Sequence, residues 1–406
     1  MHRPLLALLI AVAGCGSNGS PADLATPPDL TTVDLAAVDL VPTDLADSPG
    51  PPDLFGVDLA GYPAAHAPFP QLARHQGGVI SHVRLVTVTY DDFPYRAVVE
   101  EWGDFVFGSK WLQAVGAEYG VVGGSQIARV HLPGSAPAEV QTGDLLDKLD
   151  VLMDAGMAPA PMDGYDDQVY YAIHLPETTT LTDGNGKGCQ DYYGFHSTSI
   201  HGGIIFPFAI IMDCGGGVPD LTSTAAHELI ETATDGYQNP HEGYYLDAAF
   251  PSHYYAEPFG EVADLCNDEN YVYEKGHAMQ PSWSNAAAAA GLAPCVPNNG
   301  WPFYGMDVVP ATAPTVAPGT MVTFTITGWS MSPRNDWSIG VAASMGSALT
   351  NMQLHPTLSA NKINNGKSVT LTLTVPAGAT SGKVGTVDVY SNEIATRLAP
   401  ASFIVQ

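Results

Sequence analysis

Basic side chains are scarce in this 406-residue chain. Only 14 Lys and Arg residues stand against 42 Asp and Glu, which gives a formal net charge of -28. Such a surface repels the phosphates of nucleic acids and anionic lipid head groups, so we expect no nucleic-acid partner. The same charge suits either an exported protein that stays soluble or a protein that attracts divalent cations.

Several motifs of common enzymes are also missing. The sequence contains no G-x-S-x-G elbow for a serine nucleophile, no phosphate-binding loop and no dinucleotide fingerprint. It contains no C-x-x-C pair, so a four-cysteine zinc site is not expected. Any chemistry must therefore come from another set of side chains.

The N-terminal apolar run is too short to cross a bilayer. It extends from Leu5 to Ala13 behind a short basic start, which is typical of a signal peptide. It ends in Ala13-Gly14-Cys15, which resembles the lipobox of bacterial lipoproteins, where the cysteine is lipidated after cleavage. We therefore expect residues 1–15 to be a lipoprotein signal peptide, with the lipid on Cys15 anchoring the protein to the bacterial cell envelope, at the outer membrane or the cell surface. An ordinary signal peptide that contains a cysteine is the alternative.

Residues 16–64 are expected to form a disordered tether. The dipeptide Asp-Leu recurs there, mostly five residues apart, and no Lys or Arg occurs between Arg3 and Arg74. A five-residue period fits neither helix nor strand, and like charges with little apolar bulk keep a segment extended. A calcium-binding repeat is the alternative, although one carboxylate per repeat is few for calcium.

Four cysteines remain after Cys15. An even number in an oxidising compartment predicts two disulfides, with three pairings open. We expect the nearest neighbours to pair, Cys189 with Cys214 and Cys266 with Cys295, and free buried thiols are the alternative.

Residues 65–304 mix strand and helix patterns. Strands are expected at 80–90, 168–175 and 203–212, and helices at 95–119, 144–153 and 222–235. This mixture predicts an α/β or α+β domain in which the last helix lies beside a sheet. Residues 305–406 instead show short segments of period two separated by Pro and Gly turns, which predicts an all-β immunoglobulin-like sandwich that acts as a spacer or binding module.

The expected helix at 222–235 carries the most informative motif. His227 and Glu231 are four residues apart and therefore share one helix face, with Glu228 beside them. This is the layout of the zinc-protease helix H-E-x-x-H, except that the second ligand is a carboxylate. An amphipathic helix with these three side chains in solvent is the alternative.

Further carboxylates support a metal. Asp235 lies two turns beyond His227, and Glu261 and Asp264 are three residues apart on a second element anchored by Cys266. Gathering so many carboxylates is costly unless a cation neutralises them.

These motifs resemble a known family. The run His-Glu-Leu-Ile-Glu-Thr-Ala-Thr-Asp at 227–235, followed by Gly-Glu-Val-Ala-Asp-Leu-Cys at 260–266, resembles the paired signature of the phosphate-induced protein 1 (EXORDIUM-like) family and its secreted bacterial relatives. The resemblance covers about residues 75–297. Plant members of that family are implicated in growth and the cell wall, without an agreed biochemical activity.

The arrangement also resembles the gluzincin metallopeptidases, in which a downstream glutamate completes the metal site. This resemblance implies that His227, Glu231 and Glu261 are ligands and that Glu228 is the base that deprotonates a metal-bound water. It also implies that Asp264 orients His227. Zn²⁺ is the expected ion, and the extra carboxylate keeps Ca²⁺ and Mn²⁺ open. Candidates for a fourth ligand or a substrate contact are His196, His201, His241 and His253.

The sequence thus predicts a metal-dependent hydrolase, most simply a zinc peptidase, displayed on the cell envelope by a lipid anchor. Its partners would be the membrane and extracellular protein or cell-wall material. The alternative is a non-catalytic surface binding protein with a structural metal or a metal-free carboxylate cluster.

Overall fold

The computed structural model describes residues 61–164, 168–183, 186–236, 243–246, 260–267, 269–343, 351–391 and 397–406. The expected signal peptide, Cys15 and the tether up to residue 60 lie outside these residues, as do His241 and His253. None of the helices in the described ranges combines the length and apolarity that crossing a bilayer requires.

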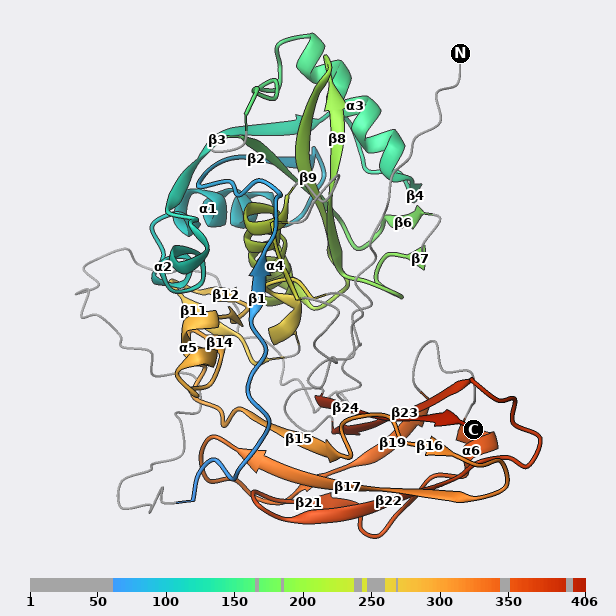
Figure 1. Cartoon of the computed structure of the whole chain (residues 1–406). Coiled ribbons are helices and arrows are strands. Elements are labelled where there is room, and N and C mark those ends of the chain that lie inside the picture. Colours follow the sequence, from blue (N-terminus) through green and yellow to red (C-terminus); the bar gives the residue numbers. More distant parts are fainter. Residues whose placement is uncertain are drawn as a thin grey trace, which may run out of the picture.

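A five-stranded sheet forms the centre of the main domain, in the order β3-β2-β5-β9-β8 (Figure 1). Its strands are β2 (His82–Tyr90), β3 (Gly123–Leu132), β5 (Val169–Leu175), β8 (Gly194–His201) and β9 (Ile204–Met212). Neighbouring strands are parallel except for β8, which pairs antiparallel with β9 at one edge. The mixed α/β class expected for this part of the chain is therefore confirmed.

Helices cover both faces of this sheet. They are α1 (Arg96–Val106), α2 (Lys110–Gly116) and α4 (Gly217–Asp235) on one face and α3 (Thr142–Asp154) on the other. Successive strand residues point to opposite faces, so Tyr170 belongs to the core that contains α4 and Tyr171 to the core that contains α3. All seven residues of β5 are buried, as expected for a strand covered on both sides.

Two expected helices have different bounds. The helix expected at 95–119 is interrupted at Gly108, and Ser109 caps α2 by accepting a hydrogen bond from the Leu112 amide. The helix expected from residue 222 begins at Gly217, because Pro219 is tolerated in a first turn. The Thr222 hydroxyl therefore does not cap the helix, and it accepts a hydrogen bond from the Ala278 amide.

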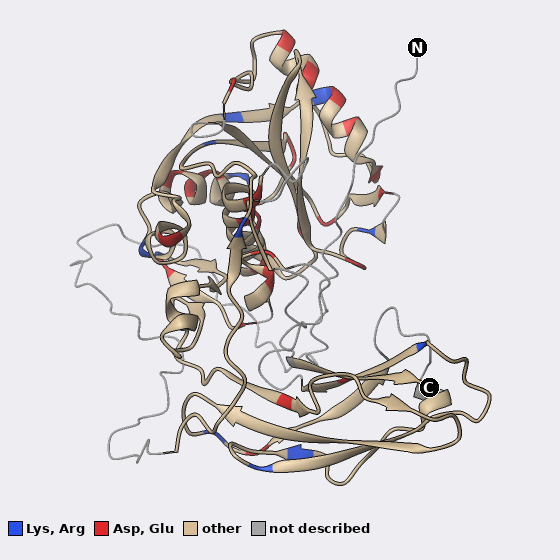
Figure 2. Cartoon of the chain, in the orientation of Figure 1, with Lys and Arg blue, Asp and Glu red and all other residues tan. Residues whose placement is uncertain are grey.

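Short elements fill the rest of the main domain. They are β1 (Leu72–Arg74), β10 (Tyr244–Leu246), β4 (Glu139–Val140), β6 (Thr180–Asp183), β7 (Gly186–Lys187), β11 (Val272–Glu274), β12 (His277–Met279), β13 (Ser282–Trp283), β14 (Cys295–Val296), α5 (Asn285–Ala289) and the 3-10 turns η1 (Ala117–Tyr119) and η2 (Asp264–Cys266). Acidic positions lie along α3 and α4, and basic positions are few (Figure 2).

Both expected disulfides are present, Cys189–Cys214 and Cys266–Cys295. Two such bridges indicate an oxidising compartment. The first joins the β7 region to the segment before α4. The second joins η2 to β14 and so fixes the chain that follows Gly260.

The C-terminal residues form two four-stranded sheets, in the orders β15-β17-β22-β20 and β16-β24-β23-β19. Their strands are β15 (Tyr304–Val309), β16 (Thr315–Val316), β17 (Met321–Ser330), β19 (Gly340–Ala343), β20 (Thr357–Leu358), β22 (Ser368–Thr374), β23 (Val384–Ser391) and β24 (Arg397–Val405). The pair β18 (Trp337–Ser338) and β21 (Lys362–Ile363) and the short helix α6 (Asn351–Leu354) accompany them. One hydrophobic core contains residues of both sheets. The C-terminal region is therefore built mainly from β-strands, as expected.

Residues 61–69 connect the two regions. His66 stacks on Trp329 of β17, and the Ala67 amide donates a hydrogen bond to Asp307 of β15 at 2.6 Å. Asn365 accepts a hydrogen bond from the Ala64 amide and donates one to the Gly61 carbonyl. The C-terminal sheets are therefore held to the main domain through this segment as well as through the chain at residue 304.

A buried histidine on β5 generates an acid-stability prediction. His174 is 1% exposed, and burial lowers its pKa to about 3. The unfolded chain binds this proton below about pH 6.5, so the folded state loses relative stability as the pH falls from 6.5 towards 3. Between pH 6.5 and 4.5 this loss amounts to roughly 2–3 kcal/mol. We expect His174→Leu to remove it, as measured by denaturant unfolding at both pH values, whereas the exposed His82→Leu should not. Equal pH dependence in wild type and His174→Leu would refute this account.

Candidate metal centre

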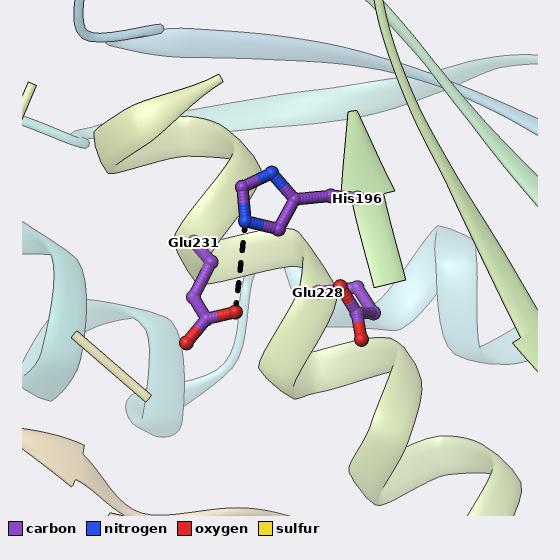
Figure 3. Close-up of side chains that lie close together, drawn as sticks. All are labelled: His196, Glu228 and Glu231. Carbon is purple, nitrogen blue, oxygen red and sulfur yellow. Dashed lines mark ion pairs between the residues drawn. The ribbon is translucent and has the colours of Figure 1, made fainter. Parts of the chain in front are cut away.

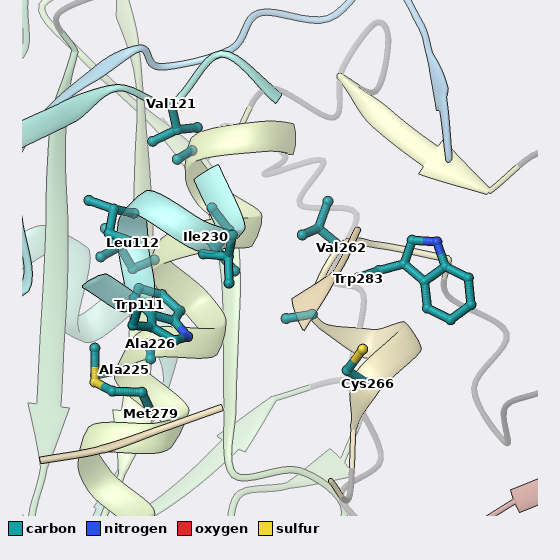
Figure 4. Close-up of a cluster of buried hydrophobic side chains, with 14 of the residues drawn as sticks. Trp111, Leu112, Val121, Ala225, Ala226, Ile230, Val262, Cys266, Met279 and Trp283 are labelled. Carbon is teal, nitrogen blue, oxygen red and sulfur yellow. The ribbon is translucent and has the colours of Figure 1, made fainter. Parts of the chain in front are cut away.

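Helix α4 turns its motif residues inward. His227 is 5% exposed, Glu228 is 1% exposed, and Glu231 and Asp235 are fully buried. The interpretation that these side chains are solvated is therefore wrong. The other faces of α4 pack through Ala226 and similar residues into the apolar cluster of Figure 4. From Leu221 onwards almost every residue of the helix is buried, so Glu228, Glu231 and Asp235 lie inside the protein.

Three further residues reach the same place from other elements. Glu261 and Asp264 come from the chain held by the Cys266–Cys295 disulfide, and they are 1% and 0% exposed. His196 comes from the edge strand β8 and is 4% exposed. His196 pairs with Ala209, whose side chain belongs to the core on the α4 side, and cross-strand partners point to the same face. The cluster thus contains two imidazoles and five carboxyl groups.

The two ring nitrogens of His227 have different surroundings. Nδ1 lies 3.1 Å from Oε1 of Gln280, and the Gln280 amide nitrogen donates to the Ala263 carbonyl at 2.9 Å. This orientation makes Nδ1 the protonated nitrogen of the neutral ring and leaves the Nε2 lone pair for another partner. Nε2 lies 2.9 Å from Oε2 of Glu231 and 3.6 Å from Oδ1 of Asp264. Although Nε2 is buried and close to Glu231, no described atom is aligned to hydrogen-bond with it.

The backbone fixes the carboxylate of Glu231. Its Oε1 accepts hydrogen bonds from the amides of Ala263 at 3.2 Å and Asp264 at 3.0 Å. Its Oε2 faces His227 and makes no hydrogen bond within the described part of the chain. One oxygen therefore holds the side chain in place while the other faces the centre of the cluster.

A second set of contacts surrounds His196 (Figure 3). Its Nε2 lies 3.2 Å from Oε2 of Glu261 and 3.7 Å from Oε2 of Glu231. Glu228 completes this set and lies against Gly194 of β8, where a Cβ atom would be 2.6 Å from its Oε1. A larger residue at position 194 would have to displace the Glu228 carboxyl group and Thr224, so glycine allows the strand to lie this close.

Burial and the neighbouring charged groups shift the pKa values of the cluster residues strongly. Burial raises the pKa of Glu228 to about 8, with Glu231 and Glu261 adding to the shift and His227 opposing it. Burial and Glu261 raise the pKa of Asp235 to about 9. Burial alone would lower the pKa of His196, but Glu261 and Glu231 raise it to about 10, and Glu231 raises the pKa of His227 in the same way. Without a cation, the cluster must therefore hold extra protons to limit its negative charge.

The residues present fit a metal ion. His227, Glu231 and Asp264 form one group whose ligand atoms lie within 4.8 Å of one another, and His196, Glu228 and Glu231 form another. Imidazole nitrogen together with carboxylate oxygen suits Zn²⁺ and Mn²⁺, whereas a cage of oxygens alone suits Ca²⁺. Nε2 of His227 and Oε2 of Glu231 are buried and have no aligned hydrogen-bond donor among the described residues. A metal ion would accept these lone pairs.

The structure brings together all the motif residues but rearranges two expected roles. Asp264, expected to orient His227 through its second ring nitrogen, lies on the Nε2 side, and Gln280 occupies the orienting place. Glu261, expected as the third ligand, contacts His196 and belongs to neither three-residue group.

Two residues of the cluster had little or no signal in the sequence. His196 was one of four unranked candidates, and Gln280 had no motif to mark it. His201, another candidate, lies away from the cluster and contacts Asp150 and Asp154 of α3.

Gln280 should act as a positioning residue for the metal. Gln280→Leu removes the acceptor that fixes the His227 ring, so we expect metal affinity to fall about 10- to 100-fold. Gln280→Glu keeps an acceptor at this position and should retain more of the affinity. Competition with a chromophoric chelator measures both, and wild-type affinity in Gln280→Leu would rule out the role.

The two disulfides offer a matched pair of variants. They close segments of 25 and 29 residues, so removing either should cost a similar stabilisation of about 3.5 kcal/mol. Only the double variant Cys266→Ser/Cys295→Ser frees the chain that carries Asp264, so only it should also weaken metal binding. Thermal unfolding and chelator competition separate the two effects. Equal losses of metal affinity in both double variants would contradict this assignment.

Comparison with known proteins finds no family model and no curated protein that matches the chain. Among solved structures, a chimeric titin Z1Z2 is 16% identical over 26% of this chain and 93% of its own, with a TM-score of 0.18. A family 123 glycoside hydrolase from Clostridium perfringens is 16% identical over 26% of this chain and 27% of its own, with a TM-score of 0.18. OgpA from Akkermansia muciniphila, solved as an inactive form with an O-glycopeptide substrate, is 11% identical over 81% of this chain and 94% of its own, with a TM-score of 0.23.

Proposed function

We propose that this protein is a metal-dependent hydrolase, most simply a zinc peptidase, that works in an oxidising compartment outside the cytoplasm. One observation carries the proposal: Nε2 of His227, Oε2 of Glu231 and a carboxylate oxygen of Asp264 converge on one buried point. Each belongs to a residue whose position is fixed by the backbone or by Gln280. A preorganised set of this kind is what a metal site requires.

His227, Glu231 and Asp264 would hold the ion. A bound Zn²⁺ would supply Lewis acidity and lower the pKa of a coordinated water. Two of these three ligands would be carboxylates, which also suit a harder ion such as Mn²⁺.

Glu228 is the residue proposed to move the proton. It follows His227 on α4, its carboxyl group lies within 4.8 Å of the Glu231 oxygen, and its Oε2 makes no hydrogen bond in the described ranges. Burial raises its pKa to about 8 in the metal-free protein, so this carboxyl group can exchange a proton near neutral pH. Peptide as the substrate class rests on the gluzincin-like spacing of His227, Glu228 and Glu231.

The wider assignments belong to the same proposal. We propose membership of the EXORDIUM-like family for the main domain and an immunoglobulin-like arrangement for the two C-terminal sheets, which share one core. We further propose a lipid anchor at Cys15, with the membrane and extracellular protein or cell-wall material as partners. The two disulfides are consistent with that location.

The second candidate is a non-catalytic surface binding protein in which the metal is structural. The burial of the cluster favours it, since every member is at most 5% exposed. A structural site is closed, whereas a catalytic site keeps one position open to substrate. The two functions predict different behaviour for Glu228.

Glu228→Gln tests the hydrolase. The change keeps the size of the side chain and removes the base, so we expect hydrolysis of an unstructured peptide library to fall by about 10²–10⁴-fold. The ion held by His227 should remain, as measured by elemental mass spectrometry on the same preparation. Glu231→Gln, which keeps the acceptor for the Ala263 and Asp264 amides, should instead lose this ion without unfolding.

A wild type that folds but binds no metal would refute the metal centre. Metal without peptide hydrolysis, together with a lower melting temperature in Glu231→Gln, would favour the structural role.

A further inference from the structure

We propose that the cluster is a dinuclear site, in which Glu231 bridges two divalent cations. The first ion lies on His227, Glu231 and Asp264, as proposed above. The second lies on His196, Glu228 and Glu231. This inference rests on the proposed metal centre and adds a second ion that the mononuclear scheme does not contain.

The two imidazoles flank one oxygen atom. Nε2 of His227 is 2.9 Å from Oε2 of Glu231, and Nε2 of His196 is 3.7 Å from the same oxygen. The rings come from different elements, His227 from α4 and His196 from β8. A carboxylate with an imidazole on each side is the arrangement of a bridging ligand between two ions about 3.5–4 Å apart.

One ion cannot serve both groups. The ligand atoms within each group lie within 4.8 Å of one another, but the five residues do not form a single group by that distance. Ligands of one ion lie about 2.0–2.2 Å from it, so two of them are separated by at most about 4.4 Å. A single ion on His227 would therefore leave His196 and Glu228 outside its coordination sphere.

The charge of the cluster also exceeds that of one ion. Glu228, Glu231, Asp235, Glu261 and Asp264 offer five carboxyl groups, all at most 1% exposed. One dication can offset two of these carboxyl groups when they are ionised and two dications can offset four, so a second ion allows more of them to be charged. Buried charges without compensation cost several kcal/mol each.

Glu228 supplies the independent observation for the second position. It is 1% exposed, and its Oε2 has no hydrogen-bond partner among the described residues. Gly194 allows β8 to approach this carboxyl group, which brings His196 of the same strand into the group. Figure 3 shows His196, Glu228 and Glu231 around the same turn of α4. With two ions bound, Glu228 would be a ligand, which replaces the role of general base that the one-ion proposal gives it.

Metal stoichiometry of the purified full chain tests the proposal. After loading with Mn²⁺ or Zn²⁺ and gel filtration in metal-free buffer, wild type should retain two ions per chain by elemental mass spectrometry. Glu228→Gln and His196→Ala should each retain one. His201→Ala is the matched control, because His201 lies on the same strand but contacts Asp150 of α3, and it should retain two. The Mn²⁺ form should give the electron paramagnetic resonance spectrum of an exchange-coupled pair.

The outcomes separate this inference from the proposed function. The dinuclear site is overturned if wild type retains one ion and gives the spectrum of an isolated Mn²⁺. It is also overturned if His196→Ala retains no metal. Either result leaves the mononuclear hydrolase standing. No ion in a folded wild type overturns both. Circular dichroism checks that His196→Ala folds. If it does not, the test rests on the number of ions in wild type, the spectrum of the Mn²⁺ form and the number of ions in Glu228→Gln.

Discussion

The compensation of buried negative charge is the constraint on which the rest of this structure depends. Five carboxyl groups lie at most 1% exposed around two imidazoles. Removing each such ion from water costs several kcal/mol, and that cost is recovered only through opposite charge or hydrogen bonds. Histidines that gain protons and carboxyls that keep theirs offset part of it. The divalent cations proposed above would offset it without extra protons, and the convergence of these side chains would then have a physical cause.

The surrounding elements are arranged to hold this cluster. The sheet supplies His196 from its edge strand, and α4 lies directly against strands β8 and β9. The chain at 260–267 closes the other side and is fixed by the Cys266–Cys295 bridge. The amides of Ala263 and Asp264 point at Glu231, so the same short segment both positions a proposed ligand and contributes one. The elements that build the core therefore also hold the cluster.

The sequence predicted what depends on local spacing. A separation of four residues places His227 and Glu231 on one face of a helix in any fold, and the disulfide pairing followed from neighbouring cysteines. The sequence did not predict what depends on tertiary contacts. His196 reaches the cluster from the antiparallel edge strand β8, and Gln280, which directly follows β12, reaches His227 across 53 residues of sequence. A sequence also does not show which ring nitrogen of His227 a neighbour approaches. It therefore did not predict that Gln280 contacts Nδ1 while Asp264 lies on the Nε2 side.

The glutamate at position 231, where zinc-protease helices have histidine, is explained by its backbone contacts. Two amides on consecutive residues donate to Oε1, and both are buried, so they need an acceptor at this position. A neutral imidazole has a single acceptor nitrogen and cannot both satisfy these amides and face a metal. A carboxylate has two oxygens and does both. Its second oxygen, Oε2, also lies 3.7 Å from Nε2 of the second imidazole, His196 of β8. The departure from the H-E-x-x-H pattern is therefore coupled to the edge strand and to the segment after Gly260, and the three features form one structural unit.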